Sequence, residues 1–424
     1  MTFSCRSCGL SGAITPEVEA SRLRVGSDQL VRVLDLGVQP LANRLLPAHQ
    51  TLEPEPRFPL DLVFCTRCML LQISETVPPE MMFRHYVYFS SFSDTFLNHA
   101  EALAERLIRE RQLNSESLVV EAASNDGYLL QFFAKKGIPV LGIDPASNVV
   151  EVARAKGIPS LDEFFGAEIA GRLVAEGKRA TVFVANNVLA HVPAINNFVA
   201  GIAELLHPEG VASIEFPYLR DMIDHLEFDT IYHEHLSYFS LSAAANLFHR
   251  HGLAIERVER LKVHGGSLRL FVASTKFARP DDSVAQLLTE EKERGIHQPV
   301  YYLDFSRRVR ELREKLRTLL LDLKTAGKRI AAYGASAKGS TLLNYLDVGT
   351  DLIDYVVDRS PHKQGMLMPG VHLPIDHPRR LIEDLPDYVL LLTWNFAEEI
   401  LAQQAECRAL GAKFILPVPE PTIV

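Results

Sequence analysis

The sequence predicts an α/β protein made of a small cysteine-rich module and two Rossmann-like units, and three observations support this. Its 424 residues exceed what one hydrophobic core usually holds, so two or three domains are expected. Two C-x-x-C pairs flank a short segment rich in strand-forming residues near the N-terminus. Apolar strands then alternate with helical segments in two separate stretches, which is typical of parallel sheets covered by helices.

The N-terminal module is predicted to cover residues 1–76, with the Pro78-Pro79 pair marking its exit. Its expected strands are Val31–Leu36, Phe58–Phe64 and Met69–Ile73. A segment of this size buries little apolar surface, so a bound metal is a reasonable source of stability.

The cysteines of this module indicate which metal it binds. Cys5 and Cys8 form one pair, Cys65 and Cys68 form the other, and Cys407 stands alone. Two such knuckles complete a tetrahedral four-sulfur site, which is typical of structural zinc because no ligand position is left open. The alternative is a thioredoxin-like redox pair, but that function calls for one motif beside a βαβ unit rather than two around a β-rich segment.

The two larger units are predicted at residues 77–284 and 285–424. The first has expected strands at 117–121, 139–144, 181–184 and 211–215, and a closing hairpin over 262–273. The second opens with a helical stretch over 285–327 that ends near Gly327, followed by strands at 329–334, 355–358, 388–392 and 413–416. One face of the helical stretch is apolar: Val309, Leu312, Leu316, Leu319, Leu320 and Leu323.

Composition excludes several classes of protein. The 44 basic and 53 acidic residues give a net charge of −9, which disfavours a general nucleic-acid binder. No stretch approaches the roughly 18 apolar residues that a membrane helix needs. Met1–Cys5 has neither a basic nor an apolar signal region, so we expect a cytoplasmic protein. We expect it to be a monomer.

The turn after the first strand of the 77–284 unit has the features of an adenosine-binding site. The segment Glu121–Gly127 joins that strand to a helix, and Asp144 ends the next strand, where its carboxylate can accept both ribose hydroxyls. The G-x-G-x-x-G turn that brings the backbone against a pyrophosphate is absent, which favours S-adenosylmethionine over NAD. The predicted cofactor-binding residues are Glu121, Ser124, Asn125, Gly127, Asp144, Pro145, Asn186 and Asn187.

The segment Tyr232-His233-Glu234-His235 is the densest group of proton-handling side chains. Histidine suits acid–base chemistry because its pKa lies near the working pH, and a tyrosine can hydrogen-bond an oxygen on which negative charge develops. A metal pair of His233 and His235 is a weaker alternative, because H-E-H differs from the H-E-x-x-H spacing that places two ligands on one helical face. An ordinary loop with satisfied polar groups is another.

Several longer segments give the sequence a specific resemblance. They are Asn186–Pro193, Ile231–Ser240, His264–Arg269 and Tyr333–Gly339, together with the two C-x-x-C pairs. Over essentially its whole length the chain resembles the C-methyltransferases of antibiotic deoxysugar pathways, which act on nucleotide-linked 4-keto sugars. It departs from them at Ala123, where the family turn usually has glycine.

The resemblance implies a class I Rossmann-like methyltransferase domain that uses S-adenosylmethionine and methylates a carbon (C-3′) next to the ketone of a thymidine-diphosphate sugar. It implies that His235 is the general base that forms the enolate. The supporting residues that it implies are Tyr232, Glu234, His191 and Tyr86.

The last unit is expected to bind the nucleotide diphosphate of the substrate. Its loop Gly334–Gly339 connects a strand to a helix, whose N-terminal N–H groups attract phosphate. The predicted substrate-binding residues are Ser336, Lys338, Gly339, Thr341, Asn344, Trp394 and Asn395. The same loop, with Asp358 at the next strand end, leaves an NAD-dependent nucleotide-sugar oxidoreductase or epimerase open. O- or N-methylation and a non-catalytic zinc-bearing adaptor are further alternatives.

Overall fold

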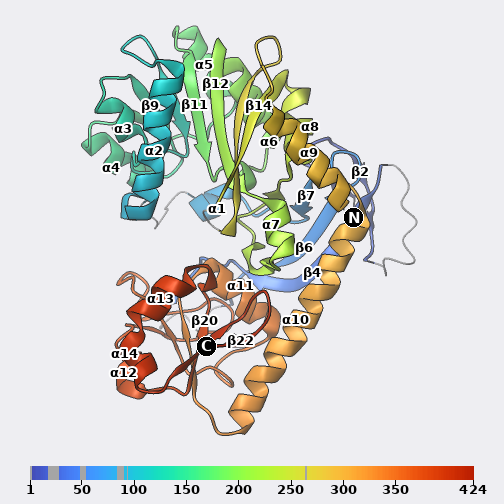
Figure 1. Cartoon of the computed structure of the whole chain (residues 1–424), viewed down its shortest axis with the longest axis vertical. Helices are drawn as coiled ribbons and strands as arrows, with labels where there is room; N and C mark the ends of the chain where they lie inside the picture. The colour runs from blue at the N-terminus through green and yellow to red at the C-terminus, as the bar shows by residue number, and fades with distance from the viewer. Residues whose placement is uncertain (1, 18–27, 48–53, 84–89, 93, 263–264) are drawn as a thin grey trace.

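The chain folds into two α/β units that are bridged by N-terminal strands and by one long helix (Figure 1). The structure, a computed structural model, describes residues 2–17, 28–47, 54–83, 90–92, 94–262 and 265–424. Helix α10 (Pro299–Thr325) runs along one side of the molecule, and β4 (Leu30–Pro40) and β6 (Arg57–Cys65) lie between the two units. Within these described ranges, no helix combines the length and the apolar character needed to cross a membrane.

The central unit contains a seven-stranded sheet in the order β10-β9-β8-β11-β12-β15-β14, in which β15 runs opposite to the other six strands. Its strands are β8 (Val119–Ala122), β9 (Val140–Ile143), β10 (Ser160–Leu161), β11 (Ala180–Asn186), β12 (Leu206–Pro217), β14 (Leu253–Leu261) and β15 (Ser267–Ser274). The predicted parallel α/β architecture is confirmed. Because parallel strands end at one edge, residues after β8, β9 and β11 lie close together there.

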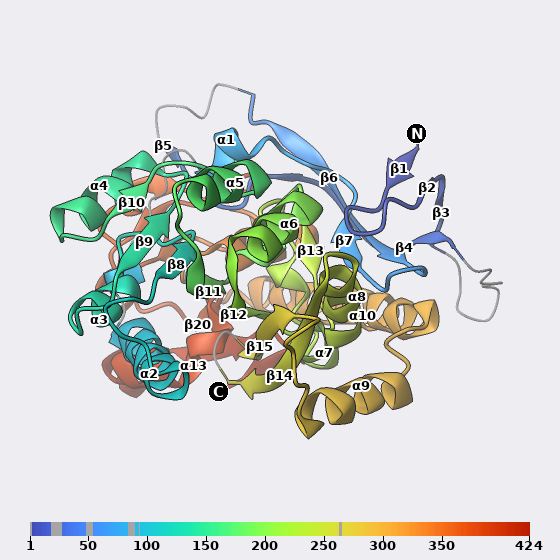
Figure 2. The same cartoon turned by 90° about the horizontal axis from the view of Figure 1, so that it is seen from above.

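Helices cover both faces of this sheet (Figure 2). Alternate residues of a strand point to opposite faces, so Val119 and Val182 pack on the side of α2 and α3, whereas Val120 and Phe183 pack on the side of α5, α6 and α8. The helices are α2 (Asp94–Arg111), α3 (Leu130–Ala134), α4 (Ser147–Ala155), α5 (Ala167–Ala175), α6 (Ile195–Leu205), α7 (Leu219–Asp224) and α8 (Leu241–Arg250).

The N-terminal segment forms a five-stranded sheet in the order β13-β7-β6-β4-β3 and a small β1-β2 hairpin. The elements are β1 (Phe3–Ser4), β2 (Ser11–Gly12), β3 (Ile14–Thr15), β5 (Leu46–Pro47), β7 (Leu71–Ile73) and β13 (Ser237–Tyr238), besides β4 and β6. Strand β13 comes from the central unit, and β5 pairs with β18 (Met366–Leu367) of the C-terminal unit. The N-terminal sheet therefore joins both larger units.

The antiparallel β4–β6 pair, called the ribbon below, makes this connection. Its register pairs Leu30 with Cys65 at one end and Pro40 with Arg57 at the other. Beyond the second end, the backbone N–H of Gly370 donates to Glu55 (2.8 Å) and Arg57 donates to the carbonyl of Gly370 (3.2 Å). The ribbon therefore reaches from the cysteines to the C-terminal unit.

The C-terminal unit has a six-stranded sheet in the order β19-β17-β16-β20-β21-β22, parallel except for β22. Its first five strands follow the connectivity of dinucleotide-binding Rossmann folds. The elements are β16 (Ile330–Tyr333), β17 (Val356–Val357), β19 (Ile375–Asp376), β20 (Tyr388–Leu391), β21 (Lys413–Leu416), β22 (Thr422–Ile423), α11 (Ala337–Leu346), α12 (Arg380–Asp384), α13 (Ala397–Gln403) and α14 (Ala405–Ala409).

Two predicted elements differ in the structure. The helical stretch is divided into α9 (Asp282–Arg294) and α10, because Gly295 adopts a left-handed φ of 79° and caps α9. The hairpin predicted over 262–273 begins earlier, since its first strand is β14, whose charged residues obscured the strand pattern. The domain boundaries at 76 and 284 stay predictions.

Candidate active site

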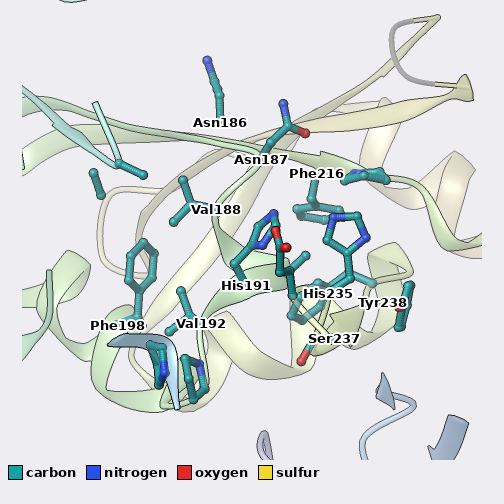
Figure 3. A pocket seen from close by; sticks show the side chains of 18 of the residues that line it. Asn186, Asn187, Val188, His191, Val192, Phe198, Phe216, His235, Ser237 and Tyr238 are labelled. Carbon is teal, nitrogen blue, oxygen red and sulfur yellow. The ribbon is translucent and has the colours of Figure 1, made fainter. Parts of the chain in front are cut away.

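A cavity of about 710 Å³ opens at the carboxyl edge of the central sheet and reaches the C-terminal unit. Several predicted site residues line it together: Asn125, Asp144, Pro145, Asn186, Asn187, His191, Tyr232, Glu234, His235, Lys338 and Asn395. Figure 3 shows the rings of His191 and His235 close together in the cavity, with Val188, Val192 and Phe198 beside them. Tyr86, the remaining predicted catalytic residue, lies outside the described residues.

Asp144 organises the cofactor side of the cavity. Its Oδ2 accepts a hydrogen bond from the backbone N–H of Asn125 (2.9 Å), and its Oδ1 accepts one from the N–H of Ala146 (2.9 Å). The carboxylate thereby ties the turn after β8 to the end of β9. Burial raises the pKa of Asp144. Each oxygen keeps a second lone pair, so the group can still accept hydrogen bonds from a ligand.

The turn itself has an unusual backbone. Ala123 and Asn125 adopt left-handed φ values of 52° and 49°, and Gly127 adopts 77°. Ser124 is fully buried and packs against Gly142, while Gly127 packs against Ile158. Ser124 and Gly127 therefore shape the turn and do not line the cavity.

Glu121 is also buried beneath the cavity, with 1% of its surface exposed. Its carboxyl group lies near the hydroxyl of Tyr128, which also lies near the side chain of Asn186. Burial raises the pKa of Glu121 well above its usual range. Tyr128, which sequence reasoning missed, lines the cavity and links the ends of β8 and β11.

The chemistry side is built around His235, in the loop after the 3-10 helix η5 (Phe228–Thr230). Its Nδ1 lies 2.8 Å from the carbonyl oxygen of Thr230 and its Nε2 lies 3.0 Å from the hydroxyl of Tyr232. A carbonyl only accepts, so Nδ1 carries the proton in the neutral ring, and the unprotonated Nε2 accepts from the hydroxyl of Tyr232 through its lone pair. That lone pair is the feature that a general base requires.

Of the two other histidines near His235, His191 lines the cavity and His233 does not. The ring of His191 packs edge-on against that of His235, with centroids 4.7 Å apart. Burial lowers the pKa of His191 to about 4, so its ring is neutral near pH 7. His233 lies outside the cavity lining and its Nε2 is 3.2 Å from the carbonyl of Pro59, to which it donates. His233 and His235 thus contact different partners and do not form a metal pair.

Glu234 lines the cavity and receives a hydrogen bond from Asn43, whose Nδ2 lies 2.7 Å from Glu234 Oε1. Burial raises the pKa of Glu234 to about 7, although the contact with Asn43 opposes this rise. Asn43 belongs to the N-terminal segment, 191 residues away along the chain. No local sequence signal marked it.

The C-terminal unit contributes a charged edge to the cavity. The ammonium of Lys338 lies 4.6 Å from the ring centroid of Trp394, and the indole N–H of Trp394 donates to Asp229 Oδ2 (2.7 Å). Glu227 also lines the cavity, and burial raises its pKa to about 8 although Lys338 opposes the rise. Sequence reasoning missed both acids, because they face Lys338 only in the folded chain.

Four other predicted substrate residues contribute to the folding of the C-terminal unit. Ser336 caps α11 by accepting from the N–H of Gly339 (3.1 Å), and Gly339 packs closely against Leu392. The amide of Asn344 donates to the carbonyls of Ser340 (2.8 Å) and Pro369 (2.9 Å), and Thr341 is 1% exposed. These four residues do not line the cavity.

The four cysteines Cys5, Cys8, Cys65 and Cys68 meet in one place, with all sulfur atoms within 4.8 Å of one another. The Cys5–Cys68 and Cys8–Cys65 sulfur distances are 3.5 and 3.6 Å. Four thiolates at about 2.3 Å from zinc lie roughly 3.8 Å apart, so the cluster fits a tetrahedral zinc ion.

Both knuckles have the same backbone pattern and are held by the central unit. The N–H groups of Gly9 and Met69 donate to the carbonyls of Cys5 (3.0 Å) and Cys65 (2.9 Å), respectively. Asn196 donates to the carbonyl of Ser7 (2.9 Å), as does Arg250 (2.9 Å). This arrangement leaves no open ligand position and suits a structural metal.

Three family descriptions match successive parts of the chain. A zinc binding domain matches residues 25–83, a methyltransferase domain matches 96–258, and a C-methyltransferase C-terminal domain matches 262–419. The C-methyltransferase NovU of Streptomyces niveus is 36% identical over 402 residues, which cover 94% of this chain and 95% of NovU.

Solved structures resemble parts of the chain less closely. Magnesium protoporphyrin IX methyltransferase (ChlM) of Synechocystis with bound SAM is 16% identical, with a TM-score of 0.33, and the match covers 42% of this chain and 79% of that chain. The PH0226 protein of Pyrococcus horikoshii is 14% identical with a TM-score of 0.36, and the match covers 47% of this chain and 100% of that chain. Taken with the family matches and the identity to NovU, the cavity and the cysteine cluster lead to one conclusion: the chain belongs to the S-adenosylmethionine-dependent C-methyltransferases that carry an N-terminal zinc-binding domain.

Proposed function

We propose that this enzyme methylates the carbon next to the ketone, C-3′, of a thymidine-diphosphate-linked 4-keto-deoxysugar, with His235 as general base. The similarity to the C-methyltransferase NovU supports methylation of a carbon. The observation that carries the proposal is the hydrogen bond between His235 Nδ1 and the carbonyl of Thr230, which keeps Nε2 unprotonated and facing the hydroxyl of Tyr232 in the cavity.

Carbon methylation differs from O- or N-methylation because the acceptor carbon must first become a nucleophile. In the proposed step, the hydroxyl of Tyr232 turns from His235 Nε2 to the ketone oxygen of the substrate. His235 Nε2 then takes the proton from the carbon next to the ketone, and the C–H electron pair moves into an enolate. The carbonyl of Thr230 holds the ring in the required tautomer and stabilises the imidazolium that forms.

Tyr232 is suited to stabilise the enolate oxygen. Its hydroxyl lies 3.0 Å from His235 Nε2, so it reaches the region where the substrate's ketone must lie for proton transfer. His191 forms the neighbouring wall, and Glu234 adds a polar group with a pKa of about 7. Tyr86 keeps its proposed supporting role.

The cofactor residues proposed to contact S-adenosylmethionine are those at the sheet edge: Asn125, Asp144, Pro145, Asn186 and Asn187. When bound, S-adenosylmethionine supplies an electrophilic sulfonium methyl group. Asp144 is suited to the ribose hydroxyls, while Glu121, Ser124 and Gly127 support the turn from beneath.

The nucleotide end of the substrate is proposed to lie against Lys338 and Asn395, because these two C-terminal residues line the same cavity as His235. Ser336, Gly339, Thr341 and Asn344 support that edge through packing and capping. Trp394 supports Lys338 through its ring.

His235→Ala should lower turnover at least about a hundredfold, because general-base catalysis typically contributes that much. Mass spectrometry and NMR of the product, with a panel of nucleotide 4-keto sugars, would measure turnover and locate the methyl group. In deuterated water, exchange at the carbon next to the ketone should also slow. The matched control is His297→Ala, because His297 is exposed and lies outside the cavity lining.

Two results would contradict the proposal. Full turnover in the His235→Ala variant would remove His235 as the base. A product methylated on oxygen or nitrogen, with no exchange at carbon in the wild type, would replace carbon methylation altogether.

A further inference from the structure

Asn43 occupies an unexpected place in the active site, since it belongs to the N-terminal module and nevertheless lines the cavity. It sits in a tight turn directly after β4, in which the N–H of Arg44 donates to the carbonyl of Leu41 (3.0 Å). Leu41 and Ala42, each 6% exposed, anchor the turn, so the side chain of Asn43 is presented from a fixed backbone.

The contact of Asn43 is with a residue that the proposed reaction uses. Its amide Nδ2 lies 2.7 Å from Oε1 of Glu234, whose side chain is buried. No other hydrogen bond to the Glu234 carboxyl group is found among the described residues. The amide therefore sets where this carboxyl group points.

A second contact connects the loop that contains Glu234 to the ribbon. His233, immediately before Glu234, donates from Nε2 to the carbonyl of Pro59 in β6 (3.2 Å), and its ring packs edge-on against Phe58. Two consecutive residues, His233 and Glu234, are thus fixed by the N-terminal module, directly before His235.

We propose that Asn43 is a positioning residue of the methyl-transfer reaction, which holds the carboxyl group of Glu234 in its working orientation. The N-terminal module, in addition to binding zinc, then completes the active site. This inference rests on the proposed function, because Glu234 is assigned there to the supporting shell of His235.

The chemistry of an amide fits this task in both ionisation states of the acid. Against a carboxylate, the NH₂ group of Asn43 donates; against a carboxylic acid, the flipped amide accepts through Oδ1. The pKa of Glu234 is about 7, so both states are populated near neutrality. An aspartate at position 43 cannot donate to a carboxylate and adds like charge.

Asn43→Ala removes the group that favours the ionised form, so the pKa of Glu234 should rise above that of the wild type. The kcat/KM at neutral pH should fall by about tenfold or more, the size of a lost hydrogen bond to a charged group. Asn43→Asp should raise the pKa further, and Asn43→Gln should recover part of the wild-type behaviour. Zinc content and S-adenosylmethionine affinity should stay unchanged in all three variants.

The pKa is measured by carbon-13 NMR of protein labelled at glutamate carboxyl groups, with Glu234→Gln identifying the resonance. Arg44→Ala is the matched control, because Arg44 is exposed in the same turn and lies outside the cavity lining. His191 and His235 share the cavity, so the NMR signal assigns the pH effect to Glu234 where a rate profile alone does not.

The outcomes separate this inference from the function on which it rests. If Asn43→Ala and Asn43→Asp keep the pKa of Glu234 and the kcat/KM of the wild type, the inference is overturned. If the wild type fails to methylate any keto sugar, the proposed function fails, while the NMR titration still decides whether Asn43 controls Glu234. A variant that loses zinc or unfolds also contradicts the inference, because that result would show that Asn43 has a structural role.

Discussion

At the scale of single residues, the cofactor turn contains a conformational conflict. Ala123 has a left-handed φ of 52°, in which an L side chain lies close to the following carbonyl oxygen. Ala123 also lines the cavity at its cofactor side. Glycine adopts this conformation without strain.

Ala123→Gly should therefore raise the free energy of unfolding by about 0.5–1 kcal/mol, because relief of strain exceeds the added entropy of the unfolded chain. Urea denaturation measures this change. The control is Ala285→Gly in the exposed face of α9, which should lower stability by about 0.5–1 kcal/mol. A loss of stability at position 123 similar to that at 285 would contradict the assignment of strain.

The acid Glu227 gives a prediction for pH. Burial raises its pKa from 4.5 to about 8, so between these values the folded protein holds a proton that the unfolded chain has released. Stability contributed by this group therefore falls as pH rises through that window. Glu227→Gln removes the titration. The difference in thermal midpoint between this variant and the wild type should therefore be more positive at about pH 8.5 than at about pH 5.

The matched control for this experiment is Glu209→Gln, since Glu209 is exposed. It should shift the midpoint equally at both pH values. Equal shifts for Glu227→Gln at the two pH values would show that Glu227 is not a buried acid in solution.

At the scale of elements, the two zinc knuckles depend on helices that come much later in the chain. Asn196 of α6 and Arg250 of α8 bind the carbonyl of Ser7, so the metal site and the central unit share hydrogen bonds. Loss of the metal should therefore loosen this contact as well as the knuckles themselves.

We expect one zinc ion per chain, and Cys68→Ser should abolish its binding, because three thiolates leave the tetrahedral site incomplete. Elemental analysis of protein purified without chelators measures the metal, and limited proteolysis reports on the N-terminal segment. Cys407→Ser, which changes the only cysteine outside the cluster, should keep the zinc. Equal zinc content in both variants would refute the four-cysteine site.

The sequence reveals elements with strong local patterns and misses those that tertiary pairing creates. The apolar runs at β8, β9 and β16 were recognisable because parallel strands are buried on both faces. The two-residue strand β13 was not, since Ser237 and Tyr238 become a strand only by pairing with β7. The same holds in the site: Tyr232 and His235 are three residues apart, whereas Asn43 meets Glu234 only after folding.

At the scale of the whole molecule, the long helix α10 and the ribbon hold two sheets so that both contribute to one cavity. The contact between Trp394 and Asp229 crosses directly from one unit to the other (2.7 Å). The C-terminal sheet has the dinucleotide-type strand order, and Asp358, at the end of its second strand, accepts hydrogen bonds from the N–H groups of Ala335 and Ser360 (both 2.8 Å), as Asp144 does from its own turn. A shared fold and a shared backbone pattern do not identify a ligand. Strand order alone therefore does not assign NAD to this unit.

Thymidine diphosphate should bind the wild-type enzyme in calorimetry, and Lys338→Ala should weaken that binding by about tenfold, the size of a lost charge-assisted hydrogen bond. NAD should show no binding. Lys328→Ala is the control, because Lys328 is exposed and pairs with Asp387 instead (3.0 Å). Tight NAD binding that disappears in the Lys338→Ala variant would favour an oxidoreductase.

The pairing of β7 with β13 and of β5 with β18 also bears on how the protein is made. During synthesis β7 emerges early, but its partner β13 is translated more than a hundred and fifty residues later. The partner of β5, strand β18, is translated later still. A ribosome-bound N-terminal fragment therefore exposes unpaired strand edges until the central and C-terminal units are translated. It follows that a gene split after residue 76 should give an aggregation-prone first product, which co-expression of the second product rescues.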